Sequence, residues 1–277
     1  MSASAAIPVR QTFWRDPALP FIEAREVEDG RGVCYDRHSH DSFSIGAITG
    51  GCSTYRNGRH SERIDTGAVV LMNPGEVHAC SPLAGNWSYL MLYVDTSWLA
   101  ALQDANEAAD GGQFRPLAER LSRDPSRYGE LRQLHATLVA PTAGLIEKEI
   151  ALHEFFSGLV RSTPSAAPVS AGKADPRLAR AADFIRSHCS DALRLEDICG
   201  AAELSASCLI RTFKAHYAMT PHEYLTHCRI QRCRERLRLG EPLARVAAET
   251  GFADQAHFQR MFKRYVAATP GEYRNCR

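Results

Sequence analysis

The sequence predicts a protein of two domains, an all-β barrel with helices after it and then an all-α domain that holds two helix-turn-helix units. Three observations predict this division. Short apolar segments separated by turn residues fill the first third, the segment 211–224 recurs as 260–273, and a Pro- and Ser-rich stretch lies between the two regions. We therefore expect domains at 1–161 and 177–277, joined by a linker at 162–176.

The composition is that of a folded protein with unevenly distributed charge. Of the 277 residues, 44% are hydrophobic and 23% are charged, which argues against extensive disorder. The formal net charge is +1, yet residues 176–277 carry 17 Lys+Arg against 11 Asp+Glu, whereas residues 1–175 carry 16 against 21. The basic C-terminal third favours a polyanionic partner for that domain.

Further features predict a cytoplasmic protein. No apolar run approaches the roughly 18 residues that span a bilayer, and the N-terminal segment has no signal-peptide pattern. The nine cysteines are scattered without Cys-x-x-Cys pairs, which argues against a disulfide framework. Membrane, secreted and fibrous classes are therefore not expected.

Residues 20–95 predict β-strands connected by turns. The pair Asn57 and Gly58 is typical of a hairpin, and Pro74 and Gly75 indicate a second tight turn. Between these turns, apolar residues either alternate with other residues or form short continuous runs, as expected for strands. No segment here is long enough for the helix of a βαβ unit, so we expect a closed or sandwich-like β domain.

Three histidines and two aromatic residues in this region are the candidate effector-binding residues. His38 and His40 are two positions apart, which places both side chains on one face of a strand, and His78 follows the second turn. Trp87 and Tyr93 suit the wall of a ligand pocket, since such pockets are mostly apolar and aromatic. We expect no cofactor here; a Zn²⁺ or other transition-metal ion, if bound, would be held by the three histidines.

Residues 144–160 predict a helix after the barrel. This helix either packs on its own barrel or joins two copies of the chain, and its periodicity does not separate the two roles. The linker that follows would let the two domains reorient. The residues expected on one stripe of the helix are Leu145, Glu149, Leu152, Phe156 and Leu159.

The C-terminal domain contains a duplicated helical unit. Residues 211–224 read RTFKAHYAMTPHEY and residues 260–273 read RMFKRYVAATPGEY, with identity at eight of the fourteen positions. Upstream of each copy, small and apolar residues recur at the i, i+3, i+4, i+7 spacing of a helix face. Each unit is therefore a short helix, a tight connection and a second helix, which is a helix-turn-helix pair.

A long helix is expected between the two copies. Thr220, Pro221 and Glu223 combine an N-cap, a proline suited to the first helical position and a capping box. The helix should end at Gly240, before Pro242. Such a spacer of about 17 residues is roughly 25 Å long at about 1.5 Å per residue, so two reading helices could lie about one DNA turn, roughly 34 Å, apart.

Five arginines lie on this connecting helix. Some could contact DNA phosphates, but a solvated helix face explains their positions at least as well, so we assign them no role. They are Arg229, Arg232, Arg234, Arg236 and Arg238.

The second helix of each unit carries the candidate DNA-binding residues on the side opposite its apolar face. Arginine can bind guanine and glutamine can bind adenine through paired hydrogen bonds, whereas lysine more often contacts phosphate. A merely solvated face is the alternative, but the same Arg and Lys recur in both copies of a basic domain. The candidates are Ser207, Arg211, Lys214, Gln255, Gln259, Arg260 and Lys263.

Residues 178–275 resemble the C-terminal DNA-binding domain of the AraC/XylS family of bacterial transcription regulators. The resemblance covers both helix-turn-helix units, including the turn at Gly251 and the Thr-Pro motif that closes each copy. It implies that the polar residues of the second helices contact bases. The sequence departs from the family pattern at Glu203, where the first turn usually has Gly, and at Ile210, a position that is often polar.

The three histidines resemble the cupin motifs HxH and PxxxH, which in this family line an effector-binding pocket. The resemblance implies a cupin-like barrel and a cytoplasmic regulator, controlled by a small-molecule effector, that acts as a homodimer on promoter DNA together with RNA polymerase. Whether it is an activator or a repressor depends on the position of the operator, which the sequence does not contain. Cupin metal sites usually add a Glu shortly after the HxH motif. Here residues 41–45 read DSFSI and contain none.

Two alternatives remain open at this stage. The barrel could be a cupin-type, oxygenase-like metal-dependent enzyme with an appended DNA-binding module, in which His38, His40 and His78 are the metal ligands. Alternatively, the chain could be a constitutive DNA-binding regulator whose barrel only dimerises. The absence of Glu from the HxH segment, and of any other acid–base constellation in the barrel, favours a regulator without catalytic residues.

Overall fold

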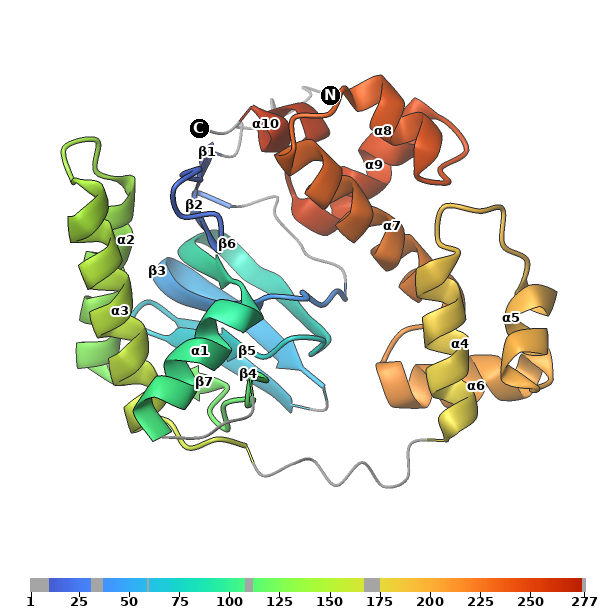
Figure 1. The fold of residues 1–277 in the computed structure, drawn as a ribbon, viewed down its shortest axis with the longest axis horizontal. Helices are drawn as coiled ribbons and strands as arrows, with labels where there is room; N and C mark the ends of the chain where they lie inside the picture. Colours follow the sequence, from blue (N-terminus) through green and yellow to red (C-terminus); the bar gives the residue numbers. More distant parts are fainter. Residues whose placement is uncertain (1–9, 31–36, 59, 108–111, 167–174, 276–277) are drawn as a thin grey trace.

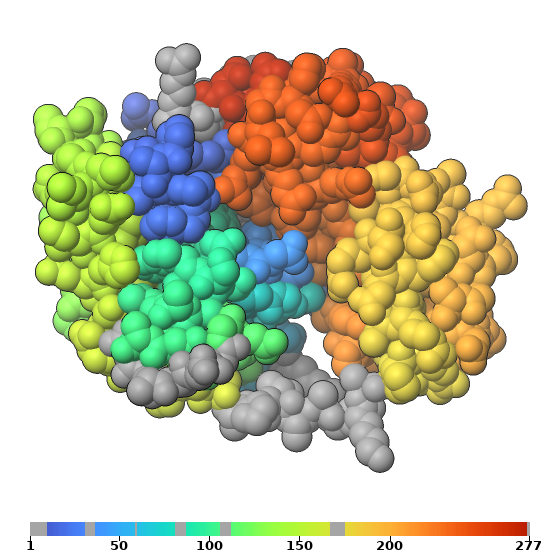
Figure 2. Space-filling view, in the orientation of Figure 1, coloured from blue at the N-terminus to red at the C-terminus, as the bar shows by residue number. Residues whose placement is uncertain are grey.

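The structure is a computed structural model that describes residues 10–30, 37–58, 60–107, 112–166 and 175–275. Figure 1 shows a sheet with helices beside it and a helical unit that lies against one side of the sheet. In the space-filling view of Figure 2, the C-terminal helices lie directly against the N-terminal strands. Across these described ranges, no helix is long and apolar enough to cross a membrane.

The N-terminal half forms one seven-stranded sheet whose described pairings are all antiparallel. The strand order is β1-β2-β6-β3-β5-β7, and β4 pairs with β3. The strands are β1 (Arg10–Trp14), β2 (Ile22–Glu28), β3 (Phe43–Asn57), β4 (His60–Asp65), β5 (Val69–Met72), β6 (His78–Val94) and β7 (Leu121–Ser122).

The expected all-β domain with C-terminal helices is confirmed, but the sheet is not closed into a barrel. Its order runs from β1 at one edge to β7 at the other, and no described pairing joins these two strands. Helices supply the cover that closure would otherwise give. Leu131 and Leu134 of the second helix and Phe156 of the third are buried in one cluster with the apolar residues of the strands.

Three helices follow the main strands: α1 (Thr96–Glu107), α2 (Pro125–Val139) and α3 (Leu145–Ser162). The helix expected at 144–160 is therefore present as α3, although its stripe is buried only in part. Leu152, Phe156 and Leu159 are buried on the sheet side, whereas Leu145 and Glu149 are exposed.

Glycines allow both tight turns that the sequence predicts. Gly58 has φ +58° in the hairpin that connects β3 to β4, and Gly75 has φ +75° in the turn that precedes β6. Glycine adopts this left-handed region without the steric cost that a Cβ atom imposes. The Gly75 N–H also donates to the His40 carbonyl oxygen at 2.8 Å, so this turn holds the segment that carries His40.

The C-terminal half is helical. Helices α5 and α6 form the first helix-turn-helix unit and α8 and α9 the second, and α7 connects them as the sequence predicts (Figure 1). The helices are α4 (Pro176–Ser187), α5 (Leu195–Ala202), α6 (Ala206–Tyr217), α7 (Pro221–Arg238), α8 (Leu243–Glu249), α9 (Gln255–Val266) and α10 (Pro270–Arg274).

The two turns differ in the residue that adopts the left-handed conformation. Gly251 has φ +80° in the second unit, and a Cβ atom there would lie 2.9 Å from the Ser190 carbonyl oxygen, so only glycine fits. Glu203 has φ +53° at the corresponding end of α5. The departure from the family pattern at Glu203 therefore keeps the fold, at a local steric cost of roughly 1–2 kcal/mol.

Capping boxes fix the starts of α7 and α10. The Thr269 hydroxyl accepts from the Glu272 N–H at 3.2 Å, while the Glu272 carboxylate accepts from the Thr269 N–H at 2.7 Å. We expect Thr269→Ala to lower the free energy of unfolding by about 1 kcal/mol, because an N-cap hydrogen bond is lost. Urea unfolding followed by circular dichroism measures this change.

Ser205 provides the matched control for that substitution. It is the N-cap of α6, but its side chain makes no capping hydrogen bond. Ser205→Ala should therefore leave the unfolding midpoint nearly unchanged. Equal destabilisation by the two substitutions would show that the Thr269 hydrogen bond is not the source of the effect.

Candidate functional site

The three candidate histidines converge although they do not share a strand. The sequence interpretation was wrong in this detail, since residues 37–42 form only an isolated bridge between His38 and His78. In that bridge each N–H donates to the other residue's carbonyl oxygen, at 3.0 and 2.9 Å. The ring centroids lie 4.4 Å apart for His38 and His78, 4.9 Å for His38 and His40, and 5.0 Å for His40 and His78.

These side chains line a small cavity inside the sheet domain. Its volume is about 40 Å³, and both aromatic residues expected in the pocket line it together with the histidines. Trp87 is fixed by its indole N–H, which donates to the Gly30 carbonyl oxygen at 3.0 Å. The lining residues are His38, His40, Ile48, Val70, Met72, His78, Cys80, Trp87, Tyr89, Met91 and Tyr93.

Burial keeps His40 and His78 neutral. It lowers the pKa of His78 to about 4, and it lowers the pKa of His40 well below the usual 6.5, with His38 and His78 adding to the effect. The Nδ1 atom of His78 lies 2.9 Å from the Glu76 carbonyl oxygen. Because a carbonyl only accepts hydrogen bonds, Nδ1 carries the proton and Nε2 keeps its lone pair.

Helix α7 contacts the outer side of the segment that carries His38 and His40. Gln231 Nε2 donates to the Ser39 carbonyl oxygen at 2.9 Å, and His227 Nε2 lies 3.2 Å from the Ser39 hydroxyl. Arg234 Nη1 lies 3.3 Å from His40 Nδ1. The three α7 residues have the i, i+4, i+7 spacing of one helix face, so this face of the DNA-binding half touches the wall of the cavity.

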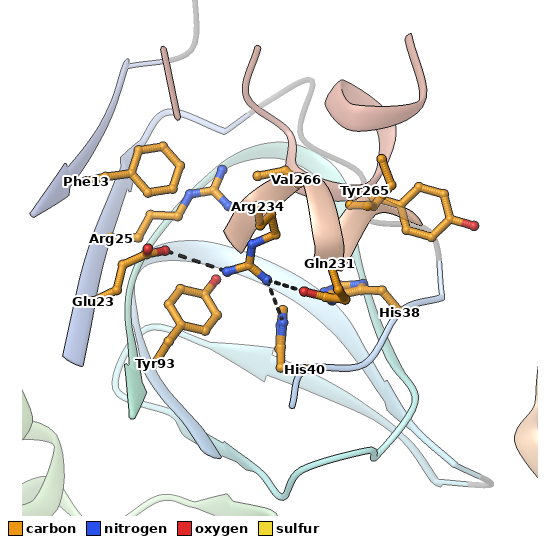
Figure 3. A pocket seen from close by; sticks show the side chains of 11 residues that line it. Phe13, Glu23, Arg25, His38, His40, Tyr93, Gln231, Arg234, Tyr265 and Val266 are labelled. Carbon is orange, nitrogen blue, oxygen red and sulfur yellow. Dashed lines mark hydrogen bonds and ion pairs between the residues drawn. The ribbon is translucent and has the colours of Figure 1, made fainter. Parts of the chain in front are cut away.

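An ion-pair network centred on Glu23 joins the two halves of the chain, as Figure 3 shows in part. Glu23 is only 2% exposed. Its carboxylate lies 3.6 Å from Arg234 Nη2, accepts from Arg15 Nε at 2.7 Å and accepts from the Tyr273 hydroxyl at 3.2 Å. Burial raises the pKa of Glu23, but the nearby arginines outweigh it, so the pKa is lowered and the group is ionised.

Two of the connecting-helix arginines therefore have a role that neither sequence interpretation included. Arg234 stacks at 5.5 Å on the Tyr93 ring, and Arg238 donates to the Pro20 carbonyl oxygen at 3.3 Å. Both contact the sheet domain; Arg234 is largely buried there, whereas Arg238 also remains exposed to solvent. A second cavity of about 20 Å³ lies at this interface, and His38, His40 and Tyr93 line both cavities.

The sequence offered only one signal for this interface. Glu23 and Arg25 are charged residues in a strand that is buried on both faces, since four consecutive residues of β2 are buried. A charge in such a strand needs a partner. Arg15 is a nearby partner of Glu23, but the other partners come from α7 and α10, far along the chain, and no local pattern identifies them.

All seven candidate DNA-binding residues are exposed on helix faces. Those of the first unit lie on α6 and those of the second on α9, opposite Phe213, Phe258 and Phe262, which are fully buried. Figure 1 places α6 and α9 toward opposite ends of α7. Ile210 on α6 is also exposed, so an apolar side chain interrupts the polar face of the first unit.

Comparisons with known families match both halves of the chain. The family described as AraC-like ligand binding domain matches residues 23–155, and a helix-turn-helix domain family matches residues 198–275. The transcriptional activator RhaS of Yersinia pestis is 26% identical over 266 residues, which cover 92% of this chain and 93% of RhaS. An AraC-like transcription regulator of Streptomyces antibioticus is 32% identical over 140 residues, 50% of this chain and 45% of that protein.

Solved structures of ToxT from Vibrio cholerae share the fold. An apo variant has a TM-score of 0.59 at 17% identity and covers 92% of this chain and 97% of its own. ToxT bound to an unsaturated fatty acid has a TM-score of 0.52 at 15% identity, with 96% of this chain and 94% of that chain covered. The likeness thus extends over the sheet domain and both helix-turn-helix units.

Proposed function

Since this chain belongs to the AraC family of DNA-binding transcription regulators with an N-terminal ligand-binding domain, we propose that occupancy of the histidine cavity controls its binding to promoter DNA. The contact between α7 and the segment that carries His38 and His40 is the observation that carries this proposal. Occupancy can shift an equilibrium only through different affinities for two states. A contact that is present when the halves are packed and absent when they separate provides that difference.

The DNA-binding surface in this proposal consists of the seven exposed residues of α6 and α9. Gln255, Gln259 and Arg260 would contact base edges, together with Ser207 and Arg211 from the first unit. Lys214 and Lys263 would contact phosphates. The exposure of all seven side chains supports this assignment, because a reading helix must present them free of the core.

The effector surface in this proposal consists of His38, His40, His78, Trp87 and Tyr93. Their common position around one cavity supports the assignment. A ToxT structure holds an unsaturated fatty acid, so the fold admits a small molecule. We assign this chain the role of a regulator and not of an enzyme, as its relatives are described as regulators, and as an activator it would contact RNA polymerase in the cytoplasm.

A thermal-shift screen of the full chain against small metabolites, with and without a chelator, tests the effector site. A ligand at 100 times its Kd should stabilise the protein by about 2.7 kcal/mol, and the hit should change the affinity for DNA. Trp87→Ala should abolish that shift, with Trp98→Ala as the control for loss of an indole elsewhere. If no bound ligand changes the affinity for DNA, the chain is instead a constitutive regulator.

We also propose that the chain forms a homodimer through α3. Ile146 and Ile150 are 72% and 53% exposed and are four residues apart on one face of that helix. Ile150→Lys should weaken dimerisation by at least about tenfold, because a buried isoleucine contributes about 1.5–3 kcal/mol. Analytical ultracentrifugation measures the dissociation constant.

Leu239→Lys is the control for the dimer prediction, since Leu239 is 81% exposed at the end of α7. It should leave the dissociation constant unchanged. A monomeric wild-type chain, or equal effects of the two substitutions, would remove α3 as the dimer surface.

A further inference from the structure

We propose that the cluster of His38, His40 and His78 binds a divalent transition-metal ion, and that this ion separates α7 from the sheet domain because metal ligation by His40 excludes its hydrogen bond with Arg234. The inference rests on the proposed effector role of the cavity and names the class of effector. It is carried by the placement of the ring nitrogens and by the hydrogen bonds that two of the rings make outside the cluster.

The cluster has the donor set of a transition-metal site. One ring nitrogen from each histidine lies within 4.8 Å of the other two, and all three residues are buried. Neutral imidazole suits Zn²⁺, Co²⁺, Ni²⁺ and Cu²⁺, whereas Mg²⁺ and Ca²⁺ prefer oxygen ligands. Three protein ligands leave a fourth tetrahedral position for solvent, and the cavity of about 40 Å³ has room for an ion and solvent.

His78 already has the outer hydrogen bond that metal-bound histidines show. Its Nδ1–H donates to the Glu76 carbonyl oxygen at 2.9 Å, which fixes the tautomer and leaves the Nε2 lone pair for the cluster. A hydrogen bond from the ring nitrogen that does not bind the metal orients the histidine and makes the ligating nitrogen more basic.

His40 is held in the opposite tautomer by the DNA-binding half. A guanidinium only donates hydrogen bonds, so Nδ1 of His40 must accept from Arg234 and its proton must lie on Nε2. A protonated nitrogen has no lone pair for a metal. If His40 ligates the metal through Nε2, its Nδ1 carries the proton, and two N–H donors then face each other without a hydrogen bond. If His40 ligates through Nδ1, that atom can no longer accept from Arg234.

The contact with Arg234 and metal ligation by His40 are therefore mutually exclusive. The ion would also draw the rings together, because Zn–N bonds of about 2.0–2.1 Å place nitrogens of a tetrahedral site roughly 3.3 Å apart. Ser39, which accepts from Gln231, lies between the two ligating residues and would move with them. The metal would thus weaken the α7 contact at two points.

The first test measures Co²⁺ and Zn²⁺ binding to the full chain. One Co²⁺ per chain should bind with the visible absorption of a tetrahedral site, and Zn²⁺ should displace it. His78→Ala, which leaves the Arg234 contact in place, should abolish this absorption. A wild-type chain that binds neither ion, or a His78→Ala variant with unchanged spectrum and affinity, would overturn the proposed site.

The second test measures the coupling through its reciprocity. If the metal opens the α7 contact, loss of that contact must tighten metal binding by the same factor. Arg234→Met should therefore lower the Zn²⁺ dissociation constant by at least about fivefold, with the exposed Arg232→Met as the control. Gln231→Ala, which removes the hydrogen bond to Ser39 and the one that Gln231 accepts from Arg234, should act in the same direction to a smaller extent.

The shape of the molecule gives an independent readout. Zn²⁺ should increase the radius of gyration of the wild-type chain in X-ray scattering and leave that of Arg234→Met unchanged. Equal Zn²⁺ affinity in the wild type, Arg234→Met and Gln231→Ala would overturn the proposed coupling between metal binding and the α7 contact. Sequence-specific DNA binding in a chain that takes up no metal would overturn this inference alone and leave the proposed function intact.

Discussion

Arg260→Ala is expected to weaken binding to the selected DNA site by about fivefold to 150-fold, which corresponds to about 1–3 kcal/mol for one paired contact with guanine. Arg260 is exposed on α9, on the side opposite the buried Phe258 and Phe262. The substitution therefore removes a surface side chain and leaves the core of the second unit intact. Fluorescence anisotropy with a labelled duplex gives the dissociation constant, and circular dichroism confirms that the variant is folded.

Two further variants show what kind of contact is lost. Lys263→Ala should weaken binding to all sequences alike and reduce the slope of log K against log salt by about 0.9. Arg56→Ala, at an exposed position of the sheet domain, should change neither quantity. The assignment of Arg260 fails if its removal leaves both the affinity and the discrimination between the selected site and a scrambled duplex unchanged.

Glu23→Ala is expected to separate the helical half from the sheet domain. The substitution leaves Arg15, Arg234 and Arg238 near the interface without the buried carboxylate that they share. Removal of one partner from a buried ion pair typically costs about 3–5 kcal/mol. X-ray scattering should show a larger radius of gyration for Glu23→Ala. The control Glu62→Ala, at an exposed position of β4, should leave the radius of gyration unchanged. An unchanged radius would contradict the role of Glu23.

The same carboxylate predicts how the interface responds to pH. The pKa of Glu23 is lowered in the folded protein, so its contribution to stability is complete above the ordinary carboxyl pKa of 4.5 and is lost as the pH falls through the lower, folded value. The wild-type interface should therefore weaken only in that acidic range. Glu23→Ala should lack this part of the pH dependence, which scattering at a series of pH values measures.

The parts of the fold that follow from local patterns could be predicted from the sequence. The duplication predicted both helix-turn-helix units, and the capping box at Thr220 predicted the start of α7, because each depends on residues close in the chain. The convergence of His38, His40 and His78 was also expected, although a single bridge holds His38 beside His78 where a strand was expected. Whether the sheet closes into a barrel depends on whether its two edge strands, β1 and β7, pair with each other. The alternation of apolar residues within each strand does not encode that pairing.

The interface between the two halves could not be predicted in this way. Glu23 and Arg234 are separated by most of the chain, and a lone charge in a buried strand does not specify its partner. The arginines of α7 also follow no pattern that separates Arg234, which lies against the sheet, from Arg232, which is exposed. Only the packing of the two halves distinguishes them.

Selection of binding sites from a randomised duplex library by the full chain tests the central claim most directly. The account predicts enriched sites with two conserved blocks about one helical turn, 10–10.5 base pairs, apart. The variant Arg211→Ala/Arg260→Ala should lose both blocks, and addition of the ligand or ion that fills the histidine cavity should change the recovery of the sites. Enrichment by the wild-type chain that does not exceed that of the double variant would contradict the account.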